Sequence, residues 1–217
     1  MTNHARAIDF CQKAEAASDL QRYDQAEQMA RQAIAIDPSL ADAFGSLSRA
    51  LIGQNRYEEA AEVAREAIGL EPDFWWYHSL LARCQLGMKQ SKQAVATAEE
   101  AVRLAPYLPY VHDLLGDVRM AREQYQSAME SYERGLQLDG EHTGCLAGKG
   151  RVLIELGRYP EAESFYRAVL EQQPMNSVAL NNLGVCLEGQ KDHKRAALAY
   201  KAAVLLIRPA ITQNRIP

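Results

Sequence analysis

The segment GRVLIELGRYPEAESFYRAVLEQQP, residues 150–174, contains two stretches in which small and apolar residues recur every three or four positions. That spacing is the period of one face of a helix. The polar turn ELGRY at residues 155–159 separates the two stretches, and Pro174 follows the second one. Because proline cannot continue a helix, the segment predicts two helices joined by a short turn.

The same pattern recurs along the whole chain at intervals of 34 residues. Pro38, Pro72 and Pro106 are spaced by 34, Pro174 lies 68 beyond Pro106, and Gly140 fills the skipped place. A repeat of this length decides the fold. The expected divisions are a leader at 1–6, six contiguous blocks at 7–40, 41–74, 75–108, 109–142, 143–176 and 177–210, and a tail at 211–217.

Residues at equivalent positions of the six blocks support this register. Position 20 is alanine in every block, and position 8 is always a small residue. In the first three blocks position 8 is alanine or serine and position 24 is alanine. In the last three, position 8 is glycine and position 24 is tyrosine, which gives the pairs Gly116 with Tyr132, Gly150 with Tyr166, and Gly184 with Tyr200. We expect each pair to be in contact, because the two side chains together must fill a constant space.

These positions resemble the tetratricopeptide repeat, whose signature has small residues at positions 8, 20 and 27, an aromatic residue near 24 and proline at 32. The resemblance covers 204 of the 217 residues. It implies an all-α fold of six helix-turn-helix hairpins. A single hairpin cannot bury its apolar stripe, so the hairpins are expected to stack into one solenoid, or superhelix, over residues 7–210.

The glycine-rich stretch GCLAGKG at 144–150 needs a separate interpretation, because glycines before a lysine are typical of phosphate loops. Such a loop has four residues between its first glycine and the Gly-Lys pair, and a Ser or Thr follows. Here three residues intervene and Gly150 follows Lys149. The register instead predicts the first helix of block five. Lys149 is then expected to carry its ammonium group to the surface, near Glu141 or Glu155.

Bulk properties narrow the class of protein. The formal net charge is -4, which does not favour binding to nucleic acid or to an anionic membrane. The sequence has no secretory signal pattern and no apolar run long enough to span a membrane, so a cytoplasmic location is expected. The four cysteines lack metal-ligand spacing and are expected to be buried free thiols: Cys11, Cys84, Cys145 and Cys186.

The pattern of polar residues does not indicate a catalytic site. His78 and His112 both occupy position 4 of their blocks, but no carboxylate or thiol recurs with them at a spacing suited to a metal. No arrangement of serine or cysteine with histidine is evident either. We therefore expect a protein that is not an enzyme, with no catalytic residues, no cofactor and no metal.

The resemblance also implies where a ligand would lie. In this family the first helices form the concave groove, which positions 2, 5, 6, 9 and 12 face. The combination of aromatic residues and arginine found at these positions is enriched at binding hot spots. We therefore expect a scaffold or adaptor that holds an extended peptide or protein segment with acidic and apolar or aromatic groups. The candidate residues are Arg49, Trp76, Ser79, Leu80, Arg83, Tyr110, Asp113, Leu114, Asp117, Arg151, Asn181 and Asn182.

The last block suggests a second kind of contact. Positions 29 and 31 are polar or small in the first five blocks and become Leu205 and Ile207 here. An exposed apolar face at the end of a repeat array favours association. Self-association into a homo-oligomer through Tyr200, Leu205 and Ile207 is therefore an alternative function. A regulatory or sensor region of a larger enzyme complex is another.

Overall fold

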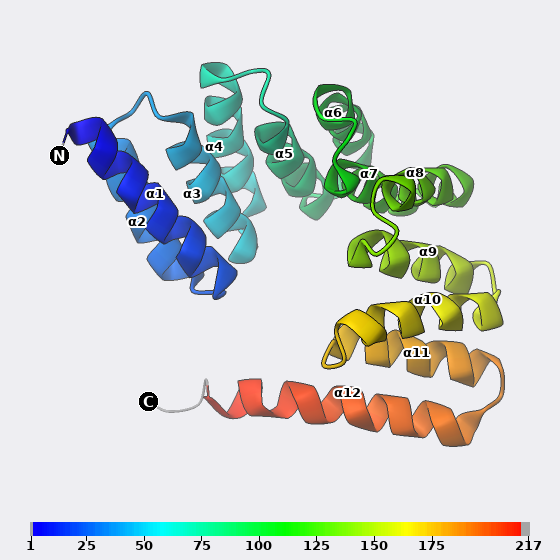
Figure 1. The fold of residues 1–217 in the computed structure, drawn as a ribbon. Coiled ribbons are helices and arrows are strands. Elements are labelled where there is room, and N and C mark those ends of the chain that lie inside the picture. The colour runs from blue at the N-terminus through cyan, green and yellow to red at the C-terminus, as the bar shows by residue number, and fades with distance from the viewer. Residues whose placement is uncertain (1, 214–217) are drawn as a thin grey trace. The chain divides into compact units, whose positions relative to one another are not determined.

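The computed structural model describes residues 2–213, with side chains over residues 2–206. Every regular element in this range is an α-helix, and twelve helices follow one another along the chain (Figure 1). The all-α fold of helical hairpins is thus confirmed. The helices fall into two compact units, Met1–Pro106 and Tyr107–Pro217. The prediction of one solenoid across residues 7–210 stays a prediction.

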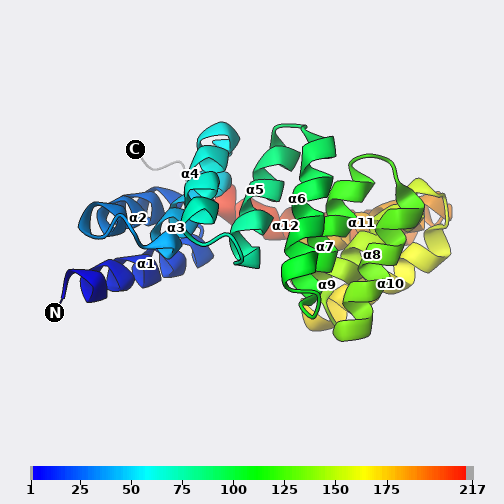
Figure 2. The ribbon, with the colours of Figure 1, turned by 90° about the horizontal axis from the view of Figure 1, so that it is seen from above.

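Unit one contains the first three hairpins. In each hairpin the two helices run antiparallel, and in both views the hairpins of the unit follow one another side by side (Figure 2). The second helix of one hairpin packs against the first helix of the next, as α2 does on α3 and α4 does on α5. The helices are α1 (Asn3–Asp19), α2 (Tyr23–Ile36), α3 (Ala41–Gly53), α4 (Tyr57–Leu70), α5 (Trp75–Gly87) and α6 (Ser91–Leu104).

Unit two repeats this arrangement with the last three hairpins. Here α8 packs on α9 and α10 packs on α11, while α7 also contacts α9. The helices are α7 (Pro109–Met120), α8 (Tyr125–Leu138), α9 (Thr143–Glu155), α10 (Tyr159–Gln172), α11 (Ser177–Gly189) and α12 (His193–Gln213). The glycine-rich stretch at 144–150 therefore lies within α9, as the register predicted.

The turn inside each hairpin has the same backbone geometry. Position 15 of every block has a positive φ of 57–70°, which ends the first helix in the left-handed conformation. An amide of the next residue then bonds back over the last turn, for example Arg158 N to Leu153 O at 2.8 Å. Only block five uses the residue best suited to this conformation, Gly157.

The cores of the hairpins confirm the predicted pairs at positions 8 and 24. A methyl group placed on Gly150 would lie 2.8 Å from Cε2 of Tyr166, and one on Gly184 would lie 2.5 Å from Cε1 of Tyr200. Gly116 lies equally close against the ring of Tyr132. The alanines at position 20 are buried in all six blocks, with at most 3% exposed. Small residues at the crossings thus let the two backbones approach.

The predicted partner of Lys149 was wrong. Its side chain does reach the surface, but its Nζ atom pairs with Glu133 Oε1 at 3.0 Å and not with Glu141 or Glu155. The same atom lies 5.0 Å from the ring centre of Phe165. The ammonium group therefore turns toward α8 and α10, where a carboxylate and an aromatic face both stabilise it.

The cysteines agree with their prediction. All four are buried and free. Burial is the largest cause of the raised pKa of each thiol, to about 11 for Cys84 and Cys186 and about 12 for Cys11 and Cys145. These thiols stay protonated at neutral pH, so they behave as small apolar side chains.

Candidate functional site

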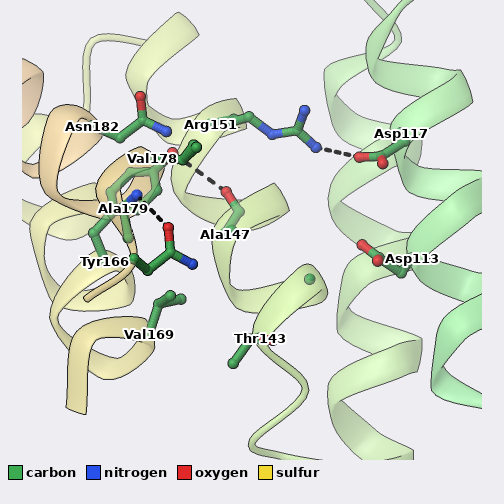
Figure 3. Close-up of a pocket in the computed structure, with 12 residues that line it drawn as sticks. Asp113, Asp117, Thr143, Ala147, Arg151, Tyr166, Val169, Val178, Ala179 and Asn182 are labelled. Carbon is green, nitrogen blue, oxygen red and sulfur yellow. Dashed lines mark hydrogen bonds and ion pairs between the residues drawn. The ribbon is translucent and has the colours of Figure 1, made fainter. Parts of the chain in front are cut away.

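A pocket of about 310 Å³ opens on the first-helix face of unit two (Figure 3). This volume is at the lower end of the range typical for ligand sites. Helix α7 forms one wall, α9 the floor, and α10 with α11 the opposite wall. The lining residues are Asp113, Asp117, Thr143, Gly144, Ala147, Arg151, Tyr166, Val169, Asn176, Val178, Ala179 and Asn182.

The hollow exists because α9 has almost no side chains where it faces the opening. Gly144 and Ala147 occupy positions 2 and 5 of block five. The carboxylate of Asp113 takes up the space over Gly144, where a methyl group would collide with it. The first turn of α9 thereby receives a negative charge near its N-terminus, which the helix dipole stabilises.

A three-residue network fixes the charged side of the pocket. Arg151 on α9 reaches across to pair with Asp117 on α7 (Figure 3). Tyr132 donates its hydroxyl hydrogen to Asp117 Oδ1 at 2.8 Å, and Arg151 Nη2 donates to the Tyr132 oxygen at 3.3 Å. Burial, followed by the charge of Asp117, raises the pKa of Tyr132, so the hydroxyl remains a donor.

Burial is the largest single influence on the pKa of Arg151 and lowers it, but the charge and hydrogen bond of Asp117 together with the neighbouring Tyr132 and Tyr166 outweigh burial, so the pKa is raised. The side chain of Arg151 is 42% exposed and that of Asp117 is 35% exposed. Both groups therefore remain open to a ligand while their charges compensate each other within the chain.

The opposite wall combines apolar groups with amides. Tyr166 donates its hydroxyl hydrogen to Ala147 O at 3.4 Å and interacts with the side chain of Asn182. Asn176 caps α11 by accepting from Ala179 N at 2.9 Å. Val178 on α11 is 68% exposed. This wall can contact an apolar group and hydrogen-bond a polar one.

Among the residues that the structure describes, no group of three or more His, Cys, Asp or Glu side chains could hold a metal ion. Cys145, which follows Gly144 in the sequence, is buried, and its raised pKa leaves no thiolate at neutral pH. The pocket therefore offers hydrogen bonds, charge and apolar contact. Within the described range, none of the helices is long and apolar enough to cross a membrane.

Four of the candidate groove residues line this pocket, namely Asp113, Asp117, Arg151 and Asn182. Asn181 is exposed but lies outside the lining, and Tyr110 is half-buried on α7. Leu114 requires a correction, because it is buried with only 6% exposed. It belongs to the core of unit two and cannot meet a ligand in this structure.

The candidate groove residues of unit one likewise include accessible residues and buried ones. Arg49 pairs with Asp19 at 2.5 Å, and Arg83 is exposed. Trp76 is half-buried and packs against Gly45, so part of its ring is core and part is surface. Two candidates are again corrected, since the exposed fractions are 0% and 1% for Ser79 and Leu80.

Several lining residues escaped the sequence analysis. Three of them occupy groove positions, namely Gly144 and Val178 at position 2 and Ala147 at position 5. They could have been predicted if a small side chain at a groove position had been interpreted as room for a ligand. Tyr166 and Val169 come from a second helix, and no first-helix pattern could find them. Thr143, Asn176 and Ala179 lie at the beginnings of α9 and α11.

Comparison with known families assigns the repeat. Two families described as tetratricopeptide repeat match the sequence, one over residues 17–64 and 51–118 and the other over 113–177 and 147–213. Together they cover residues 17–213. The chain belongs to the tetratricopeptide repeat family, whose fold supports a protein–protein interaction scaffold.

Solved structures share this fold at low sequence identity. A chain of the Cut9–Hcn1 hetero-tetramer of APC/C is similar with a TM-score of 0.84 and 13% identity, covering 93% of this chain. This chain spans only 40% of the length of that one. The TPR protein TTC0263 of Thermus thermophilus has a TM-score of 0.75 and 19% identity, with 88% of this chain and 99% of that chain covered.

YrrB, described as a TPR protein with an unusual peptide-binding site, has a TM-score of 0.55 and 22% identity, with 82% of this chain and 91% of that chain covered. These identities support the fold alone. A comparison with the curated proteins finds no significant match.

Proposed function

We propose that the protein is a non-enzymatic scaffold whose second unit binds an extended segment of a partner protein across its first-helix face. The observation that carries this proposal is the pocket at Gly144, where positions 2, 5, 6 and 9 of successive first helices surround one opening. Stacked repeats use such faces for binding, and a preformed site requires little ordering of the protein when the ligand binds.

The charges of the lining define the segment that fits. Asp113 and Asp117 bring two carboxylates to the pocket, and Arg151 brings one guanidinium. Because Arg151 is paired with Asp117, an acidic ligand group would meet an arginine whose charge is already compensated. We therefore propose a segment that places a lysine, an arginine or another hydrogen-bond donor toward α7, in contrast to the acidic groups expected from the sequence.

The same segment is expected to place an apolar group against the opposite wall. Val178, which is 68% exposed, supplies the apolar surface there, and Asn182 supplies an amide within reach of a peptide backbone. An amide side chain can both donate to and accept from a backbone, so it can bind an extended chain of varied sequence.

Filling the pocket tests this proposal. We expect Gly144→Leu to weaken binding by about tenfold or more, which is about 1.4 kcal/mol, because the side chain would occupy the floor and displace the Asp113 carboxylate. The measurement is fluorescence anisotropy with extended peptides selected on the wild-type chain from a random library. Asp113 can move, since its flexible end makes the contact, so the fold is expected to survive.

Gly69→Ala is the matched control, because a methyl group at Gly69 would meet nothing within 4 Å. The circular dichroism spectra of both variants should equal that of the wild type. Selected peptides without basic or donor groups would contradict the proposed chemistry. Peptides that bind Gly144→Leu as tightly as the wild type would contradict the site itself.

A further inference from the structure

Helix α12 has an apolar surface that the other second helices lack. Leu198, Val204 and Leu205 are 62%, 55% and 54% exposed. They lie along one broad side of the helix, together with the exposed Ala197 and Lys201. This surface is separate from the pocket on the first-helix face. The side chain of Ile207, which the sequence analysis also placed here, lies outside the described residues.

Part of this surface corresponds to positions that a helix covers elsewhere in the chain. Position 28 is half-buried where the next first helix follows within the same unit, as at Ile68 and Leu170. Phe165 and Leu170 on α10 pack in one cluster with Leu183 and Leu187, which lie on α11. At α12 the equivalent of Leu170 is Val204, which is exposed. The repeats themselves therefore show that a helix is what fits this face.

The rest of the surface is particular to α12. Positions 22 and 29 are exposed in every block, and they carry polar or small residues in the first five. In block six they are Leu198 and Leu205. The equivalents on α10 are Ser164 and Glu171, which α11 leaves exposed. A partner that buries both leucines must therefore cover more of α12 than the next repeat would.

The charge of α12 indicates the chemistry of that partner. The sequence of residues 193–213 contains lysine and arginine but neither aspartate nor glutamate. Lys194 and Lys201 are exposed beside the leucines, whereas Arg195 is held by Glu163 at 2.9 Å. A helix with apolar and acidic residues would complement this surface in both respects.

A second copy of the chain fits less well. Two α12 helices packed together would bring lysines toward lysines. A copy docking through α1 would place Asp9 and Lys13 at the contact, because they occupy positions 3 and 7, where Cys145 and Lys149 of α9 face α8. Asp9 and Lys13 form an exposed ion pair at 2.6 Å, and burying it is costly.

We infer that the exposed face of α12 binds an acidic amphipathic helix of another protein, placed partly where the first helix of a further repeat would lie. The partner helix contacts Val204 and Ala197 on the part of α12 that a further first helix would cover. It contacts Leu198 and Leu205 on the part that such a helix would leave exposed. Its carboxylates face Lys194 and Lys201. This contact makes α12 a second interaction surface, and it does not depend on the pocket of unit two.

A designed peptide tests the inference on the full chain. The probe is a fluorescein-labelled helical peptide that keeps the apolar positions of α11, namely Ala179, Leu183 and Leu187, and has glutamate at the outward positions. We expect it to bind the wild type, and Leu198→Glu combined with Leu205→Glu to weaken binding by about tenfold or more. The same peptide with lysine in place of each glutamate should not bind.

Because both leucines are exposed, the double variant is expected to keep the wild-type circular dichroism spectrum. Equal binding of the two peptides, or binding of neither, would overturn the inference. So would a wild-type dimer in light scattering that the double variant loses, since that result identifies a second copy as the occupant. Co-sedimentation with phosphatidylglycerol vesicles, without peptide binding, would identify a membrane surface instead.

Discussion

Replacing Tyr132 with alanine is expected to lower the free energy of unfolding by about 3–5 kcal/mol, as other large-to-small changes in a core do. The side chain is fully buried, and its ring lies against two glycines of different first helices, Gly116 and Gly148. Neither glycine has a side chain that could fill the space. The variant also removes the hydrogen bond to Asp117. Urea-induced unfolding followed by circular dichroism measures the loss.

Tyr132→Phe separates packing from hydrogen bonding. It keeps the ring and removes the hydroxyl, so a loss of only about 0.5–1.5 kcal/mol is expected. If the two variants lose the same free energy, the ring contributes little, and the packing explanation for Gly116 and Gly148 is wrong.

A compensating change gives a sharper test of the same contact. Between blocks two and three the equivalent pair is Ala64 with Leu80, so alanine at position 24 can be combined with leucine at position 6 of the next block. Adding Gly148→Leu to Tyr132→Ala should recover at least about 1 kcal/mol, although Gly148→Leu alone should destabilise the wild type. Strict additivity of the two changes would contradict the contact.

The repeat register could be predicted from the sequence because it depends on volume. A glycine at position 8 together with a tyrosine at position 24 requires contact, whatever the details of the backbone, and the structure places Tyr166 on Gly150. The contact of Tyr132 with Gly148 was not predicted. It joins successive hairpins, and the sequence analysis compared volumes only within one hairpin.

Polar partners were harder to predict than packing. Lys149 has carboxylates at several distances along the sequence, and it pairs with Glu133, sixteen residues away, on the preceding second helix. The pairing depends on where the tip of a long flexible side chain lies, which sequence spacing does not determine. Position 9 was predicted to place arginines in the groove, and the structure pairs one of them, Arg151, with Asp117.

The prediction that position 6 faces the groove was wrong for its two leucines, and the reason is physical. The resemblance placed this position in the groove, yet Leu80 and Leu114 are buried there while Asn182 remains half-exposed. The position lies at the edge of the seam between hairpins. Burying a leucine side chain is favourable by about 1.5–3 kcal/mol, so an apolar residue at this edge turns into the seam and an amide turns outward.

Glu27 in the first hairpin and Glu163 in the fifth accept similar sets of hydrogen bonds, and these two sets, called the clamps below, support a second large prediction. Glu27 accepts hydrogen bonds from Arg31, Gln54 and Arg56 at 2.7–2.9 Å. Glu163 accepts from three equivalent or neighbouring donors at 2.8–2.9 Å, namely Arg167, Gln190 and Arg195. Both glutamates occupy position 21 and bind donors from the following hairpin. They therefore link hairpin one to two and hairpin five to six.

Replacing both glutamates with alanine is expected to lower the free energy of unfolding at pH 7 by about 2–4 kcal/mol. Each carboxylate is only 15–16% exposed and accepts hydrogen bonds from charged donors. The arginines are about half exposed, which limits the loss at each site to about 1–2 kcal/mol. The sites lie in different units and do not share partners, so the two losses should add.

The same clamps predict how stability depends on pH. Burial alone would raise the pKa of each glutamate, but the hydrogen bonds from glutamine and arginine outweigh it, so the pKa lies below the ordinary value of 4.5. The unfolded state therefore binds protons first as pH falls. The contribution of the clamps is fully present above pH 4.5 and is lost as pH falls through the lowered pKa values.

The wild type should consequently lose stability between pH 5 and pH 3 more steeply than the double variant, as measured by urea unfolding across that range. The control is Glu62→Ala combined with Glu171→Ala, which removes two exposed glutamates and should change stability by no more than about 0.5 kcal/mol. If the double clamp variant follows the same pH curve as the wild type, the carboxylates of Glu27 and Glu163 do not hold the terminal hairpins together.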